Sequence, residues 1–77
     1  MIVWNKIGCG HYESEDKRFL IRRSWWPLKG LHYHLYDKEN CVKKEENGFC
    51  GFCYEAVNAT LCKLKAESIL RRESEEL

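Results

Sequence analysis

The sequence predicts a small α+β fold, in which an antiparallel sheet of three to four strands packs against one long C-terminal helix. Two patterns predict it. Apolar and polar residues alternate through much of the first half of the chain, as in half-buried strands. From about residue 52 the apolar residues recur at the three-and-four spacing of an amphipathic helix. With 77 residues, 44% of them hydrophobic, the chain suits a single domain over residues 1–77.

Strands are expected at about residues 2–7, 18–26 and 31–37, with 41–46 as a candidate fourth. The alternation is clearest in 18–26, and this strand is expected to end at Pro27, which has no N–H to give to a ladder. The two strands that flank Pro27 place one aromatic and mildly basic set on the face away from the helix. This set consists of Leu20, Arg22, Trp26, His32, His34 and Tyr36.

The helix is expected at about residues 52–70, with a frayed tail at 73–77. Its core stripe is predicted to consist of Cys53, Ala56, Val57, Leu61 and Leu64. The opposite face of the helix would carry Cys62, Ala66 and Ile69. That helix face is either solvated or in contact with a partner, so the chain is expected to be a monomer or a homodimer through it.

Five cysteines, Cys9, Cys41, Cys50, Cys53 and Cys62, raise the question of a metal site. The pair in "CGFC" has a spacing that suits tetrahedral zinc, and Cys9 with Cys41 could complete a set of four ligands, which would make the chain a zinc-stapled adaptor. The simpler interpretation places Cys53 in the core, at a strand-to-helix boundary, with no cofactor. An odd number of cysteines after a start without a signal peptide favours reduced thiols and a cytoplasmic location.

Charge and hydropathy narrow the classes of partner. The formal net charge is +1, which is unlike a dedicated nucleic-acid binder, although charge segregated to one face would still allow one. No apolar run approaches the roughly 20 residues of a membrane span, so no membrane partner is expected.

The sequence predicts a non-enzyme. It has no phosphate-binding glycine loop and no HExxH pattern, and a domain of this size has little volume for a deep pocket. His32 and His34, followed by Asp37, could form an acid–base pair or a metal site if a third ligand joined them. The alternative is that both histidines are exposed on the sheet surface.

The expected binding residues are Arg22, Trp26, His34 and Tyr36, with Trp and Tyr as anchors and Arg as the polar contact for a protein partner. A nucleic-acid-binding module is the alternative, because aromatic side chains stack on bases and arginines contact phosphates. It would use the same face together with Lys17, Arg18 and Arg23.

The order of several short motifs resembles a diffuse group of small proteins carried by bacteriophages and other mobile elements. The motifs are Trp4 with Lys6; Gly10, Tyr12 and Ser14; Phe19 with Ile21; Leu35, Tyr36 and Asp37; and Glu55 with Ala56. The group commonly has Thr or Ser at the helix start, where this chain has "CGFCY". The resemblance implies the sheet-plus-helix fold and an accessory factor in the host cytoplasm, one that binds and in some cases inhibits a host or defence protein.

Overall fold

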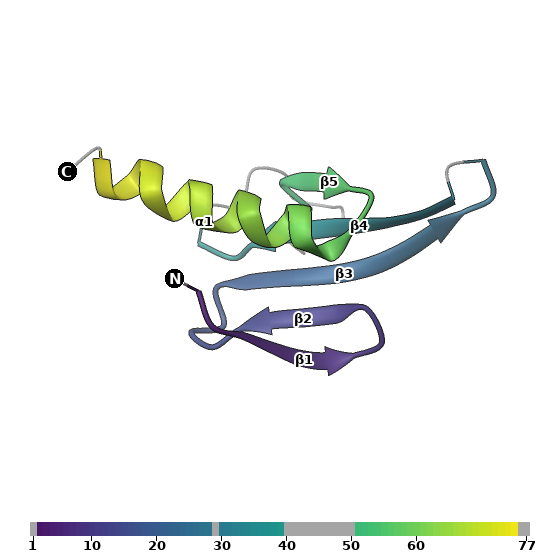
Figure 1. Cartoon of the computed structure of the whole chain (residues 1–77), viewed down its shortest axis with the longest axis horizontal. Coiled ribbons are helices and arrows are strands. Elements are labelled where there is room, and N and C mark those ends of the chain that lie inside the picture. The colour runs from purple at the N-terminus through teal and green to yellow at the C-terminus, as the bar shows by residue number, and fades with distance from the viewer. Residues whose placement is uncertain (1, 29, 40–50, 76–77) are drawn as a thin grey trace.

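The computed structural model describes residues 2–28, 30–39 and 51–75, which form five strands and one helix (Figure 1). The elements in chain order are β1 (Trp4–Gly8), β2 (His11–Ser14), β3 (Phe19–Trp26), β4 (Gly30–Asp37), β5 (Tyr54–Ala56) and α1 (Ala59–Glu75). The predicted α+β class is confirmed, with five strands in place of three to four. The candidate strand at 41–46 lies outside the described residues.

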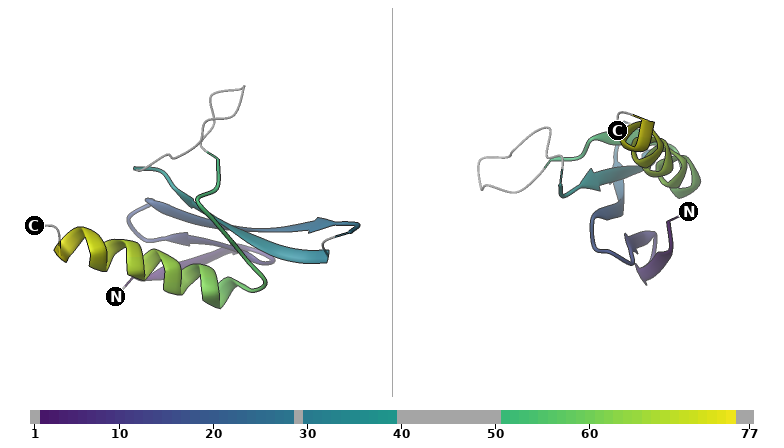
Figure 2. Two further views of the ribbon diagram at one scale, coloured as in Figure 1. Left: turned by 90° about the horizontal axis from the view of Figure 1, so that it is seen from above. Right: turned by 90° about the vertical axis from the view of Figure 1, so that its left-hand side faces the viewer.

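Each strand pairs antiparallel with the next one along the chain, so the sheet order is β1-β2-β3-β4-β5. The longest ladder joins β3 and β4 and runs from Phe19 opposite Asp37 to Trp26 opposite Gly30. The end-on view in Figure 2 shows α1 as a second layer on one face of this sheet. The helix contacts β3, β4 and β5, and the β3–β4 hairpin extends beyond its N-terminal end (Figure 1).

The helix begins later than the sequence predicts. Residues 54–56 form β5 along the edge of β4, and Cys53 donates its backbone N–H to the carbonyl of Leu35 at 2.8 Å. Asn58 then caps the helix, since its Oδ1 accepts the N–H of Leu61 at 2.9 Å. The predicted start at residue 52 is therefore wrong, because pairing with β4 holds residues 54–56 in an extended conformation.

The buried face of α1 is also the reverse of the predicted one. Cys62 and Ala66 are fully buried, and Ile69 packs beside them, whereas Leu64 is 56% exposed. Val57 and Leu61 are likewise exposed. The predicted core stripe is thus wrong for Val57, Leu61 and Leu64, whereas Ala56 is buried and Cys53 packs against the core, both before the helix begins. A homodimer through Cys62, Ala66 and Ile69 is also wrong, because these side chains already face the sheet.

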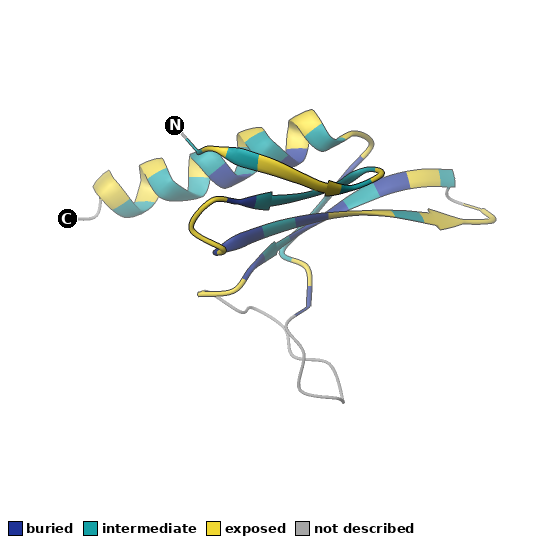
Figure 3. Ribbon diagram, turned by 90° about the horizontal axis from the view of Figure 1, so that it is seen from below, coloured by how far each residue is buried: buried dark blue, intermediate teal, exposed yellow. Residues whose placement is uncertain are grey.

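Small side chains on the helix meet large ones on the sheet. The buried cluster consists of Phe19, Ile21, Leu35, Ala56, Cys62 and Ala66. Figure 3 shows the buried part of the β3–β4 hairpin at the end away from its turn, while the turn end is largely exposed. The core is therefore confined to the half of the hairpin that the helix covers.

Arg18 ties the sheet to the C-terminal half of α1. Its guanidinium donates to both carboxylate oxygens of Asp37, at 3.0 and 3.1 Å, and to both of Glu73, at 2.9 and 2.6 Å. These carboxylates, Glu73 first, raise the pKa of Arg18 above its ordinary value. Because Glu73 is held in this way, residues 73–75 are helical and not part of a frayed tail as predicted; residues 76–77 lie outside the described residues.

We expect Arg18→Gln to lower the free energy of unfolding by about 3–5 kcal/mol, because it leaves the Asp37 carboxylate, only 2% exposed, without its cation. Lys17→Gln is the control, since its ion pair with Glu13 lies at the surface, and it should cost less than about 1 kcal/mol. Urea unfolding followed by circular dichroism measures both. Equal small losses would contradict the assigned role of Arg18.

Alkylation tests which helix face is buried. Burial raises the pKa of the Cys62 thiol to about 11, so at pH 8 it remains protonated as well as covered. We expect N-ethylmaleimide to modify exposed Cys9 rapidly and Cys62 only as the chain unfolds, as read by peptide mass spectrometry. Modification of Cys62 at the rate of Cys9 would mean that the helix packs through its other face.

Candidate functional site

The sheet brings the four predicted binding residues to one face, opposite α1. In the β3–β4 ladder Arg22 lies opposite His34, and Leu20 lies opposite Tyr36. Trp26 follows on the same face because side chains alternate along a strand. We call this the outer face of the sheet. The prediction that Arg22, Trp26, His34 and Tyr36 share one face agrees with this register, whereas their role in binding stays a prediction.

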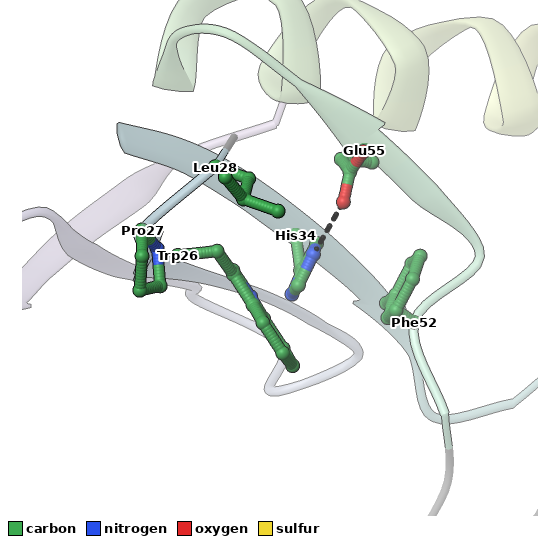
Figure 4. A pocket seen from close by; sticks show the side chains of 6 residues that line it. All are labelled: Trp26, Pro27, Leu28, His34, Phe52 and Glu55. Atoms are coloured by element: carbon green, nitrogen blue, oxygen red, sulfur yellow. Dashed lines mark hydrogen bonds and ion pairs between the residues drawn. The ribbon is translucent and has the colours of Figure 1, made fainter. Parts of the chain in front are cut away.

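A pocket of about 480 Å³ opens on the outer face near the β3–β4 turn (Figure 4). Its lining residues are Trp26, Pro27, Leu28, His34, Phe52 and Glu55. Four of these side chains are apolar, and His34 and Glu55 lie between them. Two of the predicted residues, Trp26 and His34, thus line the pocket, while Arg22 and Tyr36 share the face without lining it.

His34 is held on two sides. Its Nε2 lies 2.9 Å from Oε2 of Glu55, its partner across the β4–β5 ladder. The Phe52 ring stacks on the imidazole with centroids 3.9 Å apart and planes within 4°. Only 9% of His34 is exposed, so the part of its imidazole that a partner could reach is the edge that lines the pocket. The reason for this burial is that β5 and Phe52, two residues before β5, cover the imidazole.

His32 is buried more deeply, with 4% of its surface exposed. Its Nδ1 lies 3.0 Å from the carbonyl oxygen of Gly30. Its Nε2 is also buried and has no hydrogen-bond partner among the described residues. This nitrogen lies 3.8 Å from Oε2 of Glu55, and the two imidazole centroids are 4.8 Å apart. The expectation of two exposed histidines is therefore wrong for both.

His32, His34 and Glu55 form one cluster, in which a ligating atom from each side chain lies within 4.8 Å of the others. Two imidazoles and a carboxylate are ligand types that transition metals use. The sequence indicated the two histidines and the need for a third ligand, but it placed Glu55 on the helix. Asp37, the acid that follows them in sequence, is instead bound to Arg18.

The alternative zinc set does not converge. Cys9 lies between β1 and β2, at one edge of the sheet, and Cys53 directly precedes β5, at the opposite edge. Strands about 4.8 Å apart place these edges far beyond the reach of one ion. Burial raises the pKa of Cys53, which disfavours the thiolate that zinc requires. Cys41 and Cys50 lie outside the described residues.

The basic cluster predicted for nucleic acid is dispersed. Arg18 is buried against Asp37 and Glu73, and Lys17 pairs with Glu13 at 3.1 Å. Arg22 and Arg23 are adjacent in β3 and therefore point to opposite faces. Of the four, only Arg22 remains on the outer face without an ion pair to a described residue.

In the described part of the chain, the helix is not long and apolar enough to cross a membrane. No protein-family model, curated protein or solved structure was found to match this chain.

Proposed function

We propose that the chain is a non-enzymatic binding protein whose outer face docks onto another protein, with an apolar side chain of that partner entering the pocket. The observation that carries the proposal is a largely apolar pocket beside exposed aromatic residues. Trp26 is 57% exposed, and Leu28 is fully exposed at the turn. Apolar side chains around a pocket are typical of protein-binding sites.

The pocket is preorganised, which favours affinity. Trp26 stands on a strand that is paired with β4 to its last residue, and Phe52 is fixed by its stack on His34. Tyr36 meets the Phe52 ring edge-on, with centroids 6.5 Å apart. Side chains that are already ordered lose less entropy when a partner binds. Arg22 supplies a polar contact at the rim of the same face.

The charges of the outer face favour a protein partner over nucleic acid. Glu55 lies in the pocket, and Glu13 shares the face through its position opposite Leu20. Glu13 forms ion pairs with Lys17 and Lys38, so acids and bases are interspersed here and do not form the cluster of unpaired positive charge that phosphates favour. From the resemblance to small proteins of mobile elements, we further propose that the chain is an accessory protein in the host cytoplasm. There it would bind or inhibit a host or defence protein.

Adjacent tryptophans provide a matched test. A photo-crosslinking amino acid at position 28 would first identify the partner. The affinity of the purified partner would then be measured for the wild type, Trp26→Ala and Trp25→Ala. Trp25 is 65% exposed but points to the opposite face. We expect Trp26→Ala to weaken binding at least about 30-fold, as for a central anchor, with Trp25→Ala almost unchanged. Equal losses of affinity in the two variants would show that the pocket is not part of the interface.

A salt titration separates the protein partner from nucleic acid. Between 50 and 200 mM salt, binding through 6–10 phosphate contacts falls by about 10³–10⁵-fold. For a partner held by the pocket we expect a change below about tenfold, because apolar contacts dominate. A steep loss of affinity, together with a partner that nuclease removes, would establish the nucleic-acid alternative instead.

A further inference from the structure

We propose that His32, His34 and Glu55 bind one divalent first-row transition metal ion, with Zn²⁺ as the reference ion. The site is formed by two neighbouring strands: both histidines stand on β4, and Glu55 lies directly opposite His34 on β5. This inference stands on the cluster itself and does not depend on the proposed docking of a protein partner.

The orientation of His32 is that of a metal ligand. A carbonyl oxygen can only accept, so the contact between Nδ1 and Gly30 places the ring hydrogen on Nδ1. In the neutral ring, Nε2 then carries a lone pair. That atom is buried, has no hydrogen-bond partner within the described residues and lies 3.8 Å from Oε2 of Glu55. Metal-binding histidines commonly donate their second ring N–H to a backbone carbonyl in this way, which fixes the ring for the metal.

The spacing of the three ligands suits a metal centre. Bonds of about 2.0–2.1 Å at tetrahedral angles place ligand atoms about 3.3 Å apart. The distances from Oε2 of Glu55, 2.9 Å to His34 and 3.8 Å to His32, lie on either side of that value. All three ligating atoms lie within 4.8 Å of one another, so the side chains would rotate toward one another to share an ion. The metal would take the place of the hydrogen between His34 and Glu55, with Nδ1 of His34 becoming the protonated nitrogen.

The donor types select the class of ion. Imidazole nitrogens favour Zn²⁺, Cu²⁺, Ni²⁺ and Fe²⁺, whereas Ca²⁺ takes six to eight oxygen ligands and Mg²⁺ favours oxygen. Phe52 stacks on His34, and the centroid of the Trp26 ring lies 6.4 Å from that of His32, so each histidine has an aromatic neighbour. His34 and Glu55 also line the pocket, which gives an ion access and leaves a fourth position for water or an exogenous ligand.

An ordinary structural His–Glu pair is the rival explanation. It accounts for the contact of His34 with Glu55 but not for His32, whose buried Nε2 lies 3.8 Å from the same carboxylate without a hydrogen bond. Buried polar atoms normally have a partner, so a nitrogen in this position calls for one. A metal ion would satisfy both histidines at once.

The test is titration of the chelator-treated, full-length chain with Co²⁺, whose spectrum reports the ligand type, followed by competition with Zn²⁺. We expect one ion per chain and d–d bands without a thiolate charge-transfer band. His32→Gln and Glu55→Gln should each weaken binding at least about 100-fold, since loss of an outer partner alone costs 10–100-fold. His11→Gln and Cys53→Ser are the controls and should bind as the wild type does.

Stability gives a second measurement that does not use the spectrum. At a Zn²⁺ concentration about 100 times Kd, the melting temperature should rise by about 10 °C or more. Glu55→Gln preserves the volume of a partly exposed side chain, so it should fold and lose this rise. Absence of saturable uptake, uptake unaffected by Glu55→Gln, or a charge-transfer band lost in Cys53→Ser would each overturn the proposal.

Discussion

The fork of Arg18 between Asp37 and Glu73 fixes how the helix lies on the sheet. One guanidinium reaches the start of β3, the end of β4 and the last turns of α1, and it is nearly excluded from solvent. Two bidentate carboxylate contacts are directional, unlike the apolar contacts of the core. At the other end of the helix, the cap from Asn58 defines where α1 begins. Between these two points the helix presents Cys62 and Ala66, which are small enough to allow close approach to Phe19, Ile21 and Leu35.

This placement leaves the turn end of the β3–β4 hairpin beyond the helix, and that end carries the exposed tryptophans. Residues on the two faces of β3 therefore meet different surroundings. Phe19 and Ile21 enter the core, whereas Trp26 faces the pocket. The short strand β5 then determines which side chains lie beside His34 on the outer face of the sheet. It lies along β4 and brings Phe52 and Glu55 against His34. Edge pairing by β5 thus helps to bury His34, and His32 lies between the rings of Trp26 and His34, although alternation alone would leave both histidines in water.

The parts of the fold that depend on alternation could be predicted from the sequence. The period of two in 19–26 and 31–37 places Arg22, Trp26, His34 and Tyr36 on one face whatever the helix does. The helix face could not be decided in this way, because Leu61 and Leu64 fit the helical period as well as Cys62 and Ala66 do. A local signal was present in Asn58, a preferred capping residue three positions before Leu61. Glu55 could not be assigned to the site, because its place depends on the register between β4 and β5.

His34 and Glu55 belong both to the wall of the pocket and to the proposed metal cluster. A metal ion would bridge the carboxylate and the imidazole and add positive charge to the pocket wall. A side chain docked against Trp26 and Phe52 would in turn limit access to the fourth metal position. Where one ligand changes the affinity for the other, linkage requires the reverse change by the same factor. If the chain both docks a protein and binds a metal here, the shared residues give a route for such coupling. Its sign would depend on whether the partner supplies a ligand to the metal or excludes one.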